Sequence, residues 1–302
     1  MTILMTGLCE KGADQIWKQC NDAMYAQGVT WLEEAAYAGD AEAWFFLGHC
    51  YSWGDGAVGF NEKKAYECYL RGASAGSARA VLGALRAGQY DEQMKQSARY
   101  SIEESYRQVR DAAEMGDVYA AWQMGEAVEW EDLADYMPQT ESAREQCLFW
   151  YERAADGGII PAMVKMGKCC QNGTYREKDE KEALRWANQC AASGEVWGLF
   201  QMGEHYRQEE DWEAAFQYDY AAAKQGSSRA MLYLGQMYLN GQGTERDIQA
   251  AVQALENAAA RRALKNLEIC SIRMNWWSAM MKKRFTGMEK HMRQASKRRR
   301  FR

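Results

Sequence analysis

The sequence predicts an all-α protein, a right-handed α/α solenoid of about six helical hairpins with a C-terminal helical cap. Three observations predict this fold: a glycine-containing pattern recurs six times, its spacing is 32 to 42 residues, and strand signals are lacking. Self-similarity at such a spacing is typical of stacked helix pairs, because one pair cannot bury its apolar face alone. The pattern has two small residues, two variable residues, a glycine, and a second glycine nine positions later. The first glycines are Gly39, Gly76, Gly116, Gly158, Gly194 and Gly226.

The two glycines of the pattern have different expected roles. The first ends the second helix of one hairpin (helix B), since glycine adopts the left-handed conformation at low cost. The second lies inside the first helix of the next hairpin (helix A), where it costs about 1 kcal/mol relative to alanine. Its recurrence predicts close contact with a neighbouring helix. The second unit departs, with Leu85 in place of the glycine and Gly83 two positions earlier. The internal glycines of the other units are Gly48, Gly125, Gly167, Gly203 and Gly235.

The elements follow in order along the chain. Residues 1–39 are expected to be helices that open the array, and residues 40–262 form the repeat solenoid. An aromatic residue eight positions before the first glycine places an apolar face on helix B of four units. Residues 263–281, rich in Leu, Trp and Met, are expected to form a capping helix, because a solenoid must cover its last repeat. Residues 282–302 form a basic tail that is expected to be partly disordered.

This arrangement resembles the Sel-1-like repeat (SLR) family, a branch of the tetratricopeptide-type helical hairpins. The resemblance covers roughly residues 28–262 and implies a non-enzymatic adaptor or scaffold that binds another protein or peptide. The residues that carry it in the first full unit are Ala43, Leu47-Gly48, Tyr51, Gly54-x-Gly56, Lys64-Ala65, Gly72-Ala73 and Gly76, and in the last unit Ala230, Leu234-Gly235, Tyr238 and Gly241-x-Gly243.

A second face of helix A is the predicted partner surface. Positions six and two residues before the internal glycine, and one after it, share a helical face and differ from unit to unit. By resemblance to tetratricopeptide-type arrays, this face lines the concave side, although some members could instead pack between repeats. The partner-binding candidates are Phe46, His49, Tyr119, Gln123, Glu126, Lys165, Lys168, Trp197, Gln201, Glu204, Arg229, Tyr233 and Gln236.

No catalytic, cofactor or metal site is predicted. The stretch Gly54–Gly59 fits the dinucleotide fingerprint by letter, but a helix precedes it where the fingerprint needs a strand. His49 and His205 lie four repeats apart, too far to converge on one metal or proton-transfer site. The nine cysteines share no period and form no Cys-x-x-Cys, so we expect reduced, buried thiols and no zinc site.

An acidic segment from Glu126 to Tyr136 interrupts the third unit. Five carboxylates alternate there with Trp130 and Tyr136. One interpretation is a longer helix A with a solvated acidic side, and the other is a contact with a basic partner. Extra polar sequence at residues 90–101 likewise interrupts the second unit.

The end of the chain has the opposite charge. Residues 282–302 hold ten Lys or Arg and one Glu, a net charge of +9, so the rest of the chain carries −14 of the total −5. The tail could contact an anionic partner such as nucleic acid or a membrane, fold back on the acidic body, or remain a solubilising end.

The function expected from these observations is a cytoplasmic adaptor that binds a protein segment along the helix-A face. The alternative is an inhibitor or immunity-type protein that blocks a toxin or enzyme. No secretory signal or transmembrane segment is expected, since the start lacks a basic segment before an apolar core and no run approaches about 20 apolar residues.

Overall fold

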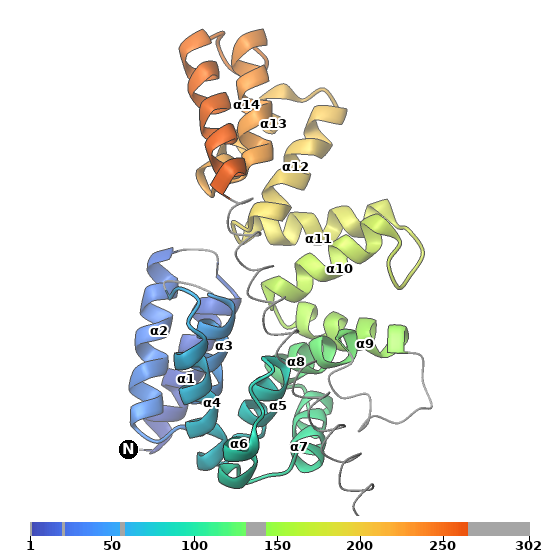
Figure 1. Ribbon diagram of the computed structural model, residues 1–302. Coiled ribbons are helices and arrows are strands. Elements are labelled where there is room, and N and C mark those ends of the chain that lie inside the picture. Colours follow the sequence, from blue (N-terminus) through green and yellow to red (C-terminus); the bar gives the residue numbers. More distant parts are fainter. Residues whose placement is uncertain (1, 20–21, 55–57, 131–142, 265–302) are drawn as a thin grey trace, which may run out of the picture. The chain divides into compact units, whose positions relative to one another are not determined.

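The computed structural model describes residues 2–19, 22–54, 58–130 and 143–264, and within these ranges the regular secondary structure is entirely helical (Figure 1). The chain divides into two compact units, Met1–Glu210 and Asp211–Arg302. The predicted all-α fold is therefore confirmed. The boundary at residue 210 lies inside the range 40–262 that the sequence predicts as one array. The predicted capping helix (apart from its first two residues), the basic tail, and most of the acidic segment lie outside the described residues.

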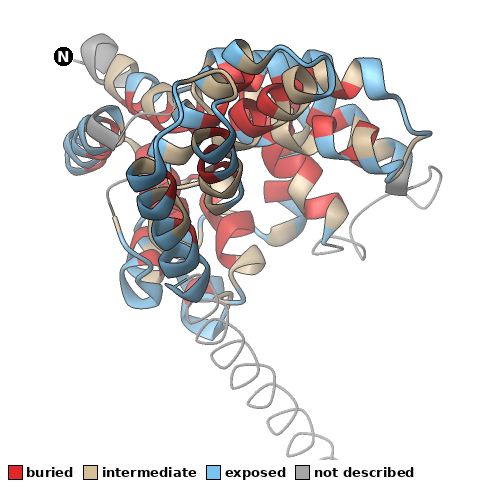
Figure 2. Ribbon diagram, turned by 90° about the horizontal axis from the view of Figure 1, so that it is seen from above, coloured by how far each residue is buried: buried red, intermediate tan, exposed pale blue. Residues whose placement is uncertain are grey.

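The larger unit is a succession of helices in which each, apart from α6, packs on the next, and α5 packs directly on α7 (Figure 1). The helices at helix-A positions are α1 (Thr2–Trp17), α3 (Ala41–Trp53), α5 (Ala78–Arg86), α8 (Val118–Glu129), α10 (Ile160–Asn172) and α12 (Val196–Gln208). Those at helix-B positions are α2 (Asp22–Tyr37), α4 (Glu62–Ala75), α7 (Ile102–Glu114), α9 (Ala143–Asp156) and α11 (Glu180–Ala192). Each helix turns its buried residues toward its neighbours and its exposed residues outward (Figure 2).

The polar sequence within the second unit, between α5 and α7, holds a short extra helix, α6 (Glu92–Ser97). Asp91 caps its start by accepting a hydrogen bond from the backbone N–H of Met94 (2.8 Å). The Met94 side chain is fully buried, and α6 packs beside α4. This insertion is therefore anchored to the array by one apolar side chain.

The smaller unit contains α13 (Trp212–Lys224), α14 (Ser228–Asn240) and a further helical stretch at residues 248–264. The rings of Phe216 and Tyr238 join α13 to α14 with centroids 5.4 Å apart. Gly235 of α14 faces Leu255, whose side chain lies 2.7 Å from the position a Cβ would take. The smaller unit thus repeats the hairpin architecture of the larger one.

The connecting glycines have the predicted conformation. All six first glycines of the pattern have positive φ, between 79° and 104°. The residue after the glycine then starts the next helix, because its side chain accepts hydrogen bonds from the first backbone N–H groups. Asp40, Ser77, Asp117, Glu195 and Ser227 cap their helices in this way. One glycine and one cap therefore define five of the six turns from helix B to helix A, and at the sixth Ile159 makes no side-chain cap bond while Pro161 stands at the start of the helix.

The internal glycines provide slots for aromatic side chains. A Cβ on Gly48 would lie 2.6 Å from the ring of Tyr69, and a Cβ on Gly83 would lie equally close to the same ring. Tyr69 is 1% exposed between α3 and α5. Gly125 faces Tyr151 in the same manner, at 2.8 Å. The close approach predicted from the glycines is confirmed, and in the degenerate second unit Gly83 takes the role of the missing glycine.

Seven cysteines lie in the described ranges, and all seven are buried and outside any disulfide, as predicted. None of the helices in the described part of the chain is both long and apolar enough to cross a lipid bilayer.

The slot at Gly48 gives a stability prediction. Replacing Gly48 by Val should lower the free energy of unfolding by about 1–3 kcal/mol, because the added methyl groups overlap the buried Tyr69 ring. Urea denaturation measures the change. Gly59→Val is the matched control, since a Cβ there meets no atom within 4 Å, and it should shift stability by less than about 0.5 kcal/mol. Equal effects of the two substitutions would contradict the close packing of Tyr69 against Gly48.

Candidate protein-interaction surface

The last turn of α1 covers part of the predicted partner surface. The Trp17 ring lies 5.2 Å from Phe46, 5.5 Å from His49 and 6.2 Å from Tyr119, measured between centroids. The Tyr119 hydroxyl also donates a hydrogen bond of 2.6 Å to Asp14. Side chains of α1, α3 and α8 thus form one aromatic cluster.

This packing corrects one expectation. Four of the thirteen candidates were expected on an open face, but only 3% to 8% of each side chain is exposed. Three of them are covered by α1, since burying aromatic surface is strongly favourable. The fourth, Gln123, donates a hydrogen bond from Nε2 to the backbone oxygen of Arg79 (3.0 Å). The four buried candidates are Phe46, His49, Tyr119 and Gln123.

Arg79 of α5 connects three helix-A positions. Its guanidinium pairs with Asp117, the N-cap of α8, and lies 3.5 Å from Glu42 of α3. Burial raises the pKa of Glu42, and the positive charge of Arg79 acts against this rise. Since the Arg79 side chain is only 11% exposed, the guanidinium serves to hold successive repeats together.

A second polar contact joins α8 to α10. Lys165 pairs with Glu129, and the hydroxyl of Tyr151 donates a 2.7 Å hydrogen bond to the same carboxylate. Burial and then this hydrogen bond raise the pKa of Tyr151, so its hydroxyl remains a proton donor. Glu126, one turn earlier, lies 3.9 Å from His49. The candidates Lys165 and Glu126 therefore contact neighbouring repeats.

Candidate side chains also connect α10 to α12. Gln171 donates a hydrogen bond to Gln201 (2.5 Å), and Gln201 lies 3.5 Å from Glu204. The ring of Trp197 fills the slot at Gly167. These candidates are half-buried, and each contributes to the packing of its own array.

The remaining candidates stay open to solvent to different degrees. Lys168 on α10 is exposed, as are Arg229 and Gln236 on α14, whereas Tyr233 is half-buried. Partner binding by these residues stays a prediction.

A different surface presents large aromatic side chains to solvent. Trp53, Arg86 and Trp130 lie at the C-terminal ends of α3, α5 and α8, and we call them the tryptophan rim. The Arg86 guanidinium lies 5.1 Å from the Trp53 ring and 4.6 Å from the Trp130 ring. Trp53 is nevertheless 47% exposed and Trp130 59% exposed. The rim therefore combines a positive charge with two accessible indoles.

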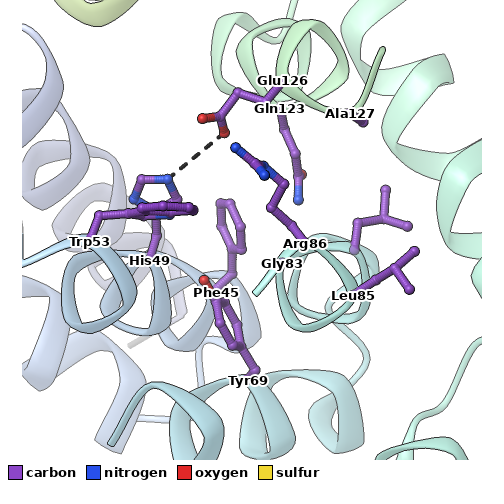
Figure 3. A pocket seen from close by; sticks show the side chains of 11 residues that line it. Phe45, His49, Trp53, Tyr69, Gly83, Leu85, Arg86, Gln123, Glu126 and Ala127 are labelled. Carbon is purple, nitrogen blue, oxygen red and sulfur yellow. Dashed lines mark ion pairs between the residues drawn. The ribbon is translucent and has the colours of Figure 1, made fainter. Parts of the chain in front are cut away.

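A small cavity lies beside the rim (Figure 3). Its volume is about 20 Å³, room for one water molecule. Arg86 and His49 reach toward Glu126 in this space, and the amide of Gln123 lines it (Figure 3). The cavity is too small for a ligand side chain.

Sequence reasoning singled out Trp130 but not Trp53 or Arg86. A signal was present, since both tryptophans follow the internal glycine of their unit by five positions. The unit between them has neither this glycine nor a tryptophan at that place. Only the three-dimensional arrangement shows that Arg86 lies between the two rings.

The sequence matches the Sel1 repeat family at residues 23–40, 41–77, 118–159, 160–195 and 228–261. The second and fifth units, at residues 78–117 with α5 to α7 and at residues 196–227 with α12 and α13, lie outside these matches. They include the unit in which Gly83 replaces the usual glycine.

Among curated proteins, an uncharacterised protein of Neisseria meningitidis serogroup B is 29% identical over 160 residues. The alignment covers 52% of this chain and 31% of that protein, so the chain matches about a third of its length.

Three solved structures are similar. A Sel1 repeat protein from Oxalobacter formigenes is 22% identical, with 87% of this chain and 86% of that chain covered and a TM-score of 0.40. A protective antigen of uropathogenic Escherichia coli strains, described as displaying an SLR fold, is 21% identical with a TM-score of 0.43 over 78% of this chain and 56% of that chain. An immunity protein from Pseudomonas aeruginosa is 14% identical with a TM-score of 0.35, covering 85% of this chain and 82% of that one.

The Arg79 contacts predict a pH-dependent loss of stability. Arg79→Gln should lower the free energy of unfolding by about 2 kcal/mol at pH 7, less than the roughly 3–5 kcal/mol of a fully buried pair, because the carboxylates are partly exposed. Glu42 has a raised pKa when folded, so its ionisation costs stability as the pH rises, and this cost grows without Arg79. The difference in the free energy of unfolding between the variant and the unsubstituted protein should therefore shrink as the pH is lowered to about 4.

Urea titrations at several pH values measure this difference. Arg107→Gln is the control, because Arg107 and its partner Glu103 are both largely exposed, and it should cost less than about 0.5 kcal/mol at every pH. A loss for Arg79→Gln that is independent of pH would contradict the electrostatic role.

The buried thiols give a labelling prediction. Burial raises the pKa of Cys68 and of Cys147 to about 12, so only about one thiol in 10⁴ ionises at pH 8, and the thiolate is the reactive form. In a Cys20→Ser, Cys270→Ser variant, an aromatic disulfide reagent should label the remaining seven thiols at least about 100-fold more slowly in the folded chain than in urea. Rapid labelling of several folded-state thiols would contradict their burial.

Proposed function

The chain belongs to the Sel1 repeat family, and we propose that it is a non-enzymatic protein that binds a segment of another protein through the tryptophan rim. The observation that carries the proposal is the exposure of Trp53 and Trp130 around Arg86. Tryptophan and arginine are the residues that most often dominate the energy of protein–protein interfaces. Two half-exposed indoles on one surface are therefore good anchors for a partner.

The rim has a rigid base. Beneath Trp53 and Arg86, Tyr69 is held between Gly48 and Gly83. Side chains on such a base lose little conformational entropy when a partner binds, which favours affinity.

An adaptor role and an inhibitor role both fit this surface. They differ in the partner: an inhibitor must suppress the activity of a bound enzyme or toxin, whereas an adaptor leaves its partner active. Buried cysteines outside any disulfide suit a reducing compartment, so we propose that the protein acts in the cytoplasm.

Site-specific photocrosslinking tests the proposal. A benzophenone amino acid in place of Trp130, introduced in the cells that naturally produce the protein, should crosslink one dominant protein. Met115 is the control position, since it is 90% exposed at the C-terminal end of α7. A crosslinker at Lys168 tests whether the helix-A face takes part.

A dominant product at Trp130 that is missing at Met115 is the expected result. Equal products at the two positions, or none at Trp130, would overturn binding through the rim. If Lys168 alone crosslinks, the partner surface is the helix-A face that the sequence predicts.

A further inference from the structure

We infer that the partner segment is basic, and that one of its Lys or Arg side chains stacks on the exposed indoles of Trp53 and Trp130. The inference rests on the proposed function and adds the chemistry of the partner. The occupant is a segment of another protein.

The rim already binds one cation. Arg86 lies within 5.1 Å and 4.6 Å of the two indole centroids, the range in which ring faces attract a positive charge. The exposed fractions of 47% and 59% leave part of each indole uncovered. The uncovered ring surface has the same electronic character, so it suits a second cation from a partner.

Three helix C-termini meet at the rim. Helix α3 ends at Trp53, α5 at Arg86, and α8 at Glu129, with Trp130 as its C-cap. The C-terminal end of a helix carries a partial negative charge, because its last carbonyl groups have no helical partner. The backbone around the rim therefore favours positive charge.

The nearby side chains do not cancel this field. Glu126 and Glu129 lie on the last turns of α8, opposite Arg86 and Lys165, so these four charges balance. The described charges near the rim therefore leave the partial negative charge of the helix ends uncompensated.

The larger unit as a whole has the same sign. Residues 1–210 hold 34 Asp or Glu against 20 Lys or Arg, a net charge of −14, whereas residues 211–281 hold seven of each. A surface of this sign speeds the association of a basic partner and disfavours an acidic one. Charge complementarity and exposed indoles together determine the choice of a basic segment.

Fluorescence anisotropy with a defined probe tests the inference on the full chain. The probe is a labelled eight-residue peptide in which arginine alternates with leucine, and its counterpart has glutamate in place of every arginine. The arginine peptide should bind at least about tenfold more tightly than the glutamate peptide. Its affinity should fall at least about threefold between 50 and 300 mM salt, because screening weakens interactions between charges.

Substitutions locate the contact. Trp53→Ala and Trp130→Ala should each weaken binding of the arginine peptide at least about fivefold, while Trp130→Phe retains most of it. Phe149→Ala is the matched control, because Phe149 is 48% exposed and has Arg153 5.3 Å from its ring on another surface, and it should leave binding unchanged. Far-ultraviolet circular dichroism and urea titration check that each variant is folded. If Trp53→Ala is unfolded, Trp130→Ala and Trp130→Phe decide.

Three results would overturn the inference: preference for the glutamate peptide, equal binding of both peptides, or equal losses in the rim and Phe149 variants. The chain's own basic tail is the competing occupant. This is tested by a variant in which Gln replaces Lys297, Arg298, Arg299 and Arg300. If that variant binds the arginine peptide at the rim at least about tenfold more tightly, the chain's own tail occupies the rim. The inference that the occupant is a segment of another protein is then wrong.

Failure of the inference is distinct from failure of the proposed function. If a protein crosslinks at Trp130 but the arginine peptide does not bind, the proposed function holds and the basic character of the partner is rejected. If the arginine peptide binds selectively but no protein crosslinks, the preference of the rim for positive charge holds and the proposed protein-binding function is rejected.

Discussion

The close approach of successive helices at glycine is the constraint on which the array depends. Tyr69 fits between α3 and α5 only because neither Gly48 nor Gly83 has a side chain. The glycines weaken each helix by about 1 kcal/mol, but burying a whole aromatic ring stabilises the fold by more than that. Gly125 and Gly167 receive Tyr151 and Trp197 in the same way. Each of these contacts thus pairs a glycine, which has no side chain, in one helix with a large aromatic ring on another helix.

This spacing explains why several of the variable positions on helix A are packing positions. Once helices approach closely, the side chains flanking each glycine meet the neighbouring repeat. Neighbouring repeats differ, so each pair needs its own chemistry: Arg79 with Asp117, Lys165 with Glu129, Gln171 with Gln201. Variation between units within one chain therefore does not distinguish partner recognition from pairing between repeats.

The sequence predicted the local features well. Positive φ at the first glycines and buried thiols both depend on residues close in the chain. It did not predict the cluster of Trp17 with Phe46 and Tyr119, because that contact joins helices distant in sequence. The substitute role of Gly83 was hidden for a related reason, since its partner ring is identified only by the geometry of α4 and α5.

The tryptophan rim remains exposed for a reason that follows from the same geometry. Side chains in the middle of helix A meet the next repeat, whereas Trp53 and Trp130 lie at the helix ends. A tryptophan that only filled space there would need a neighbouring helix to cover it. Trp53 and Trp130 have instead Arg86 between them and solvent on the remaining ring surface. Exposing that much apolar area costs stability in the isolated chain, and a bound partner would recover it.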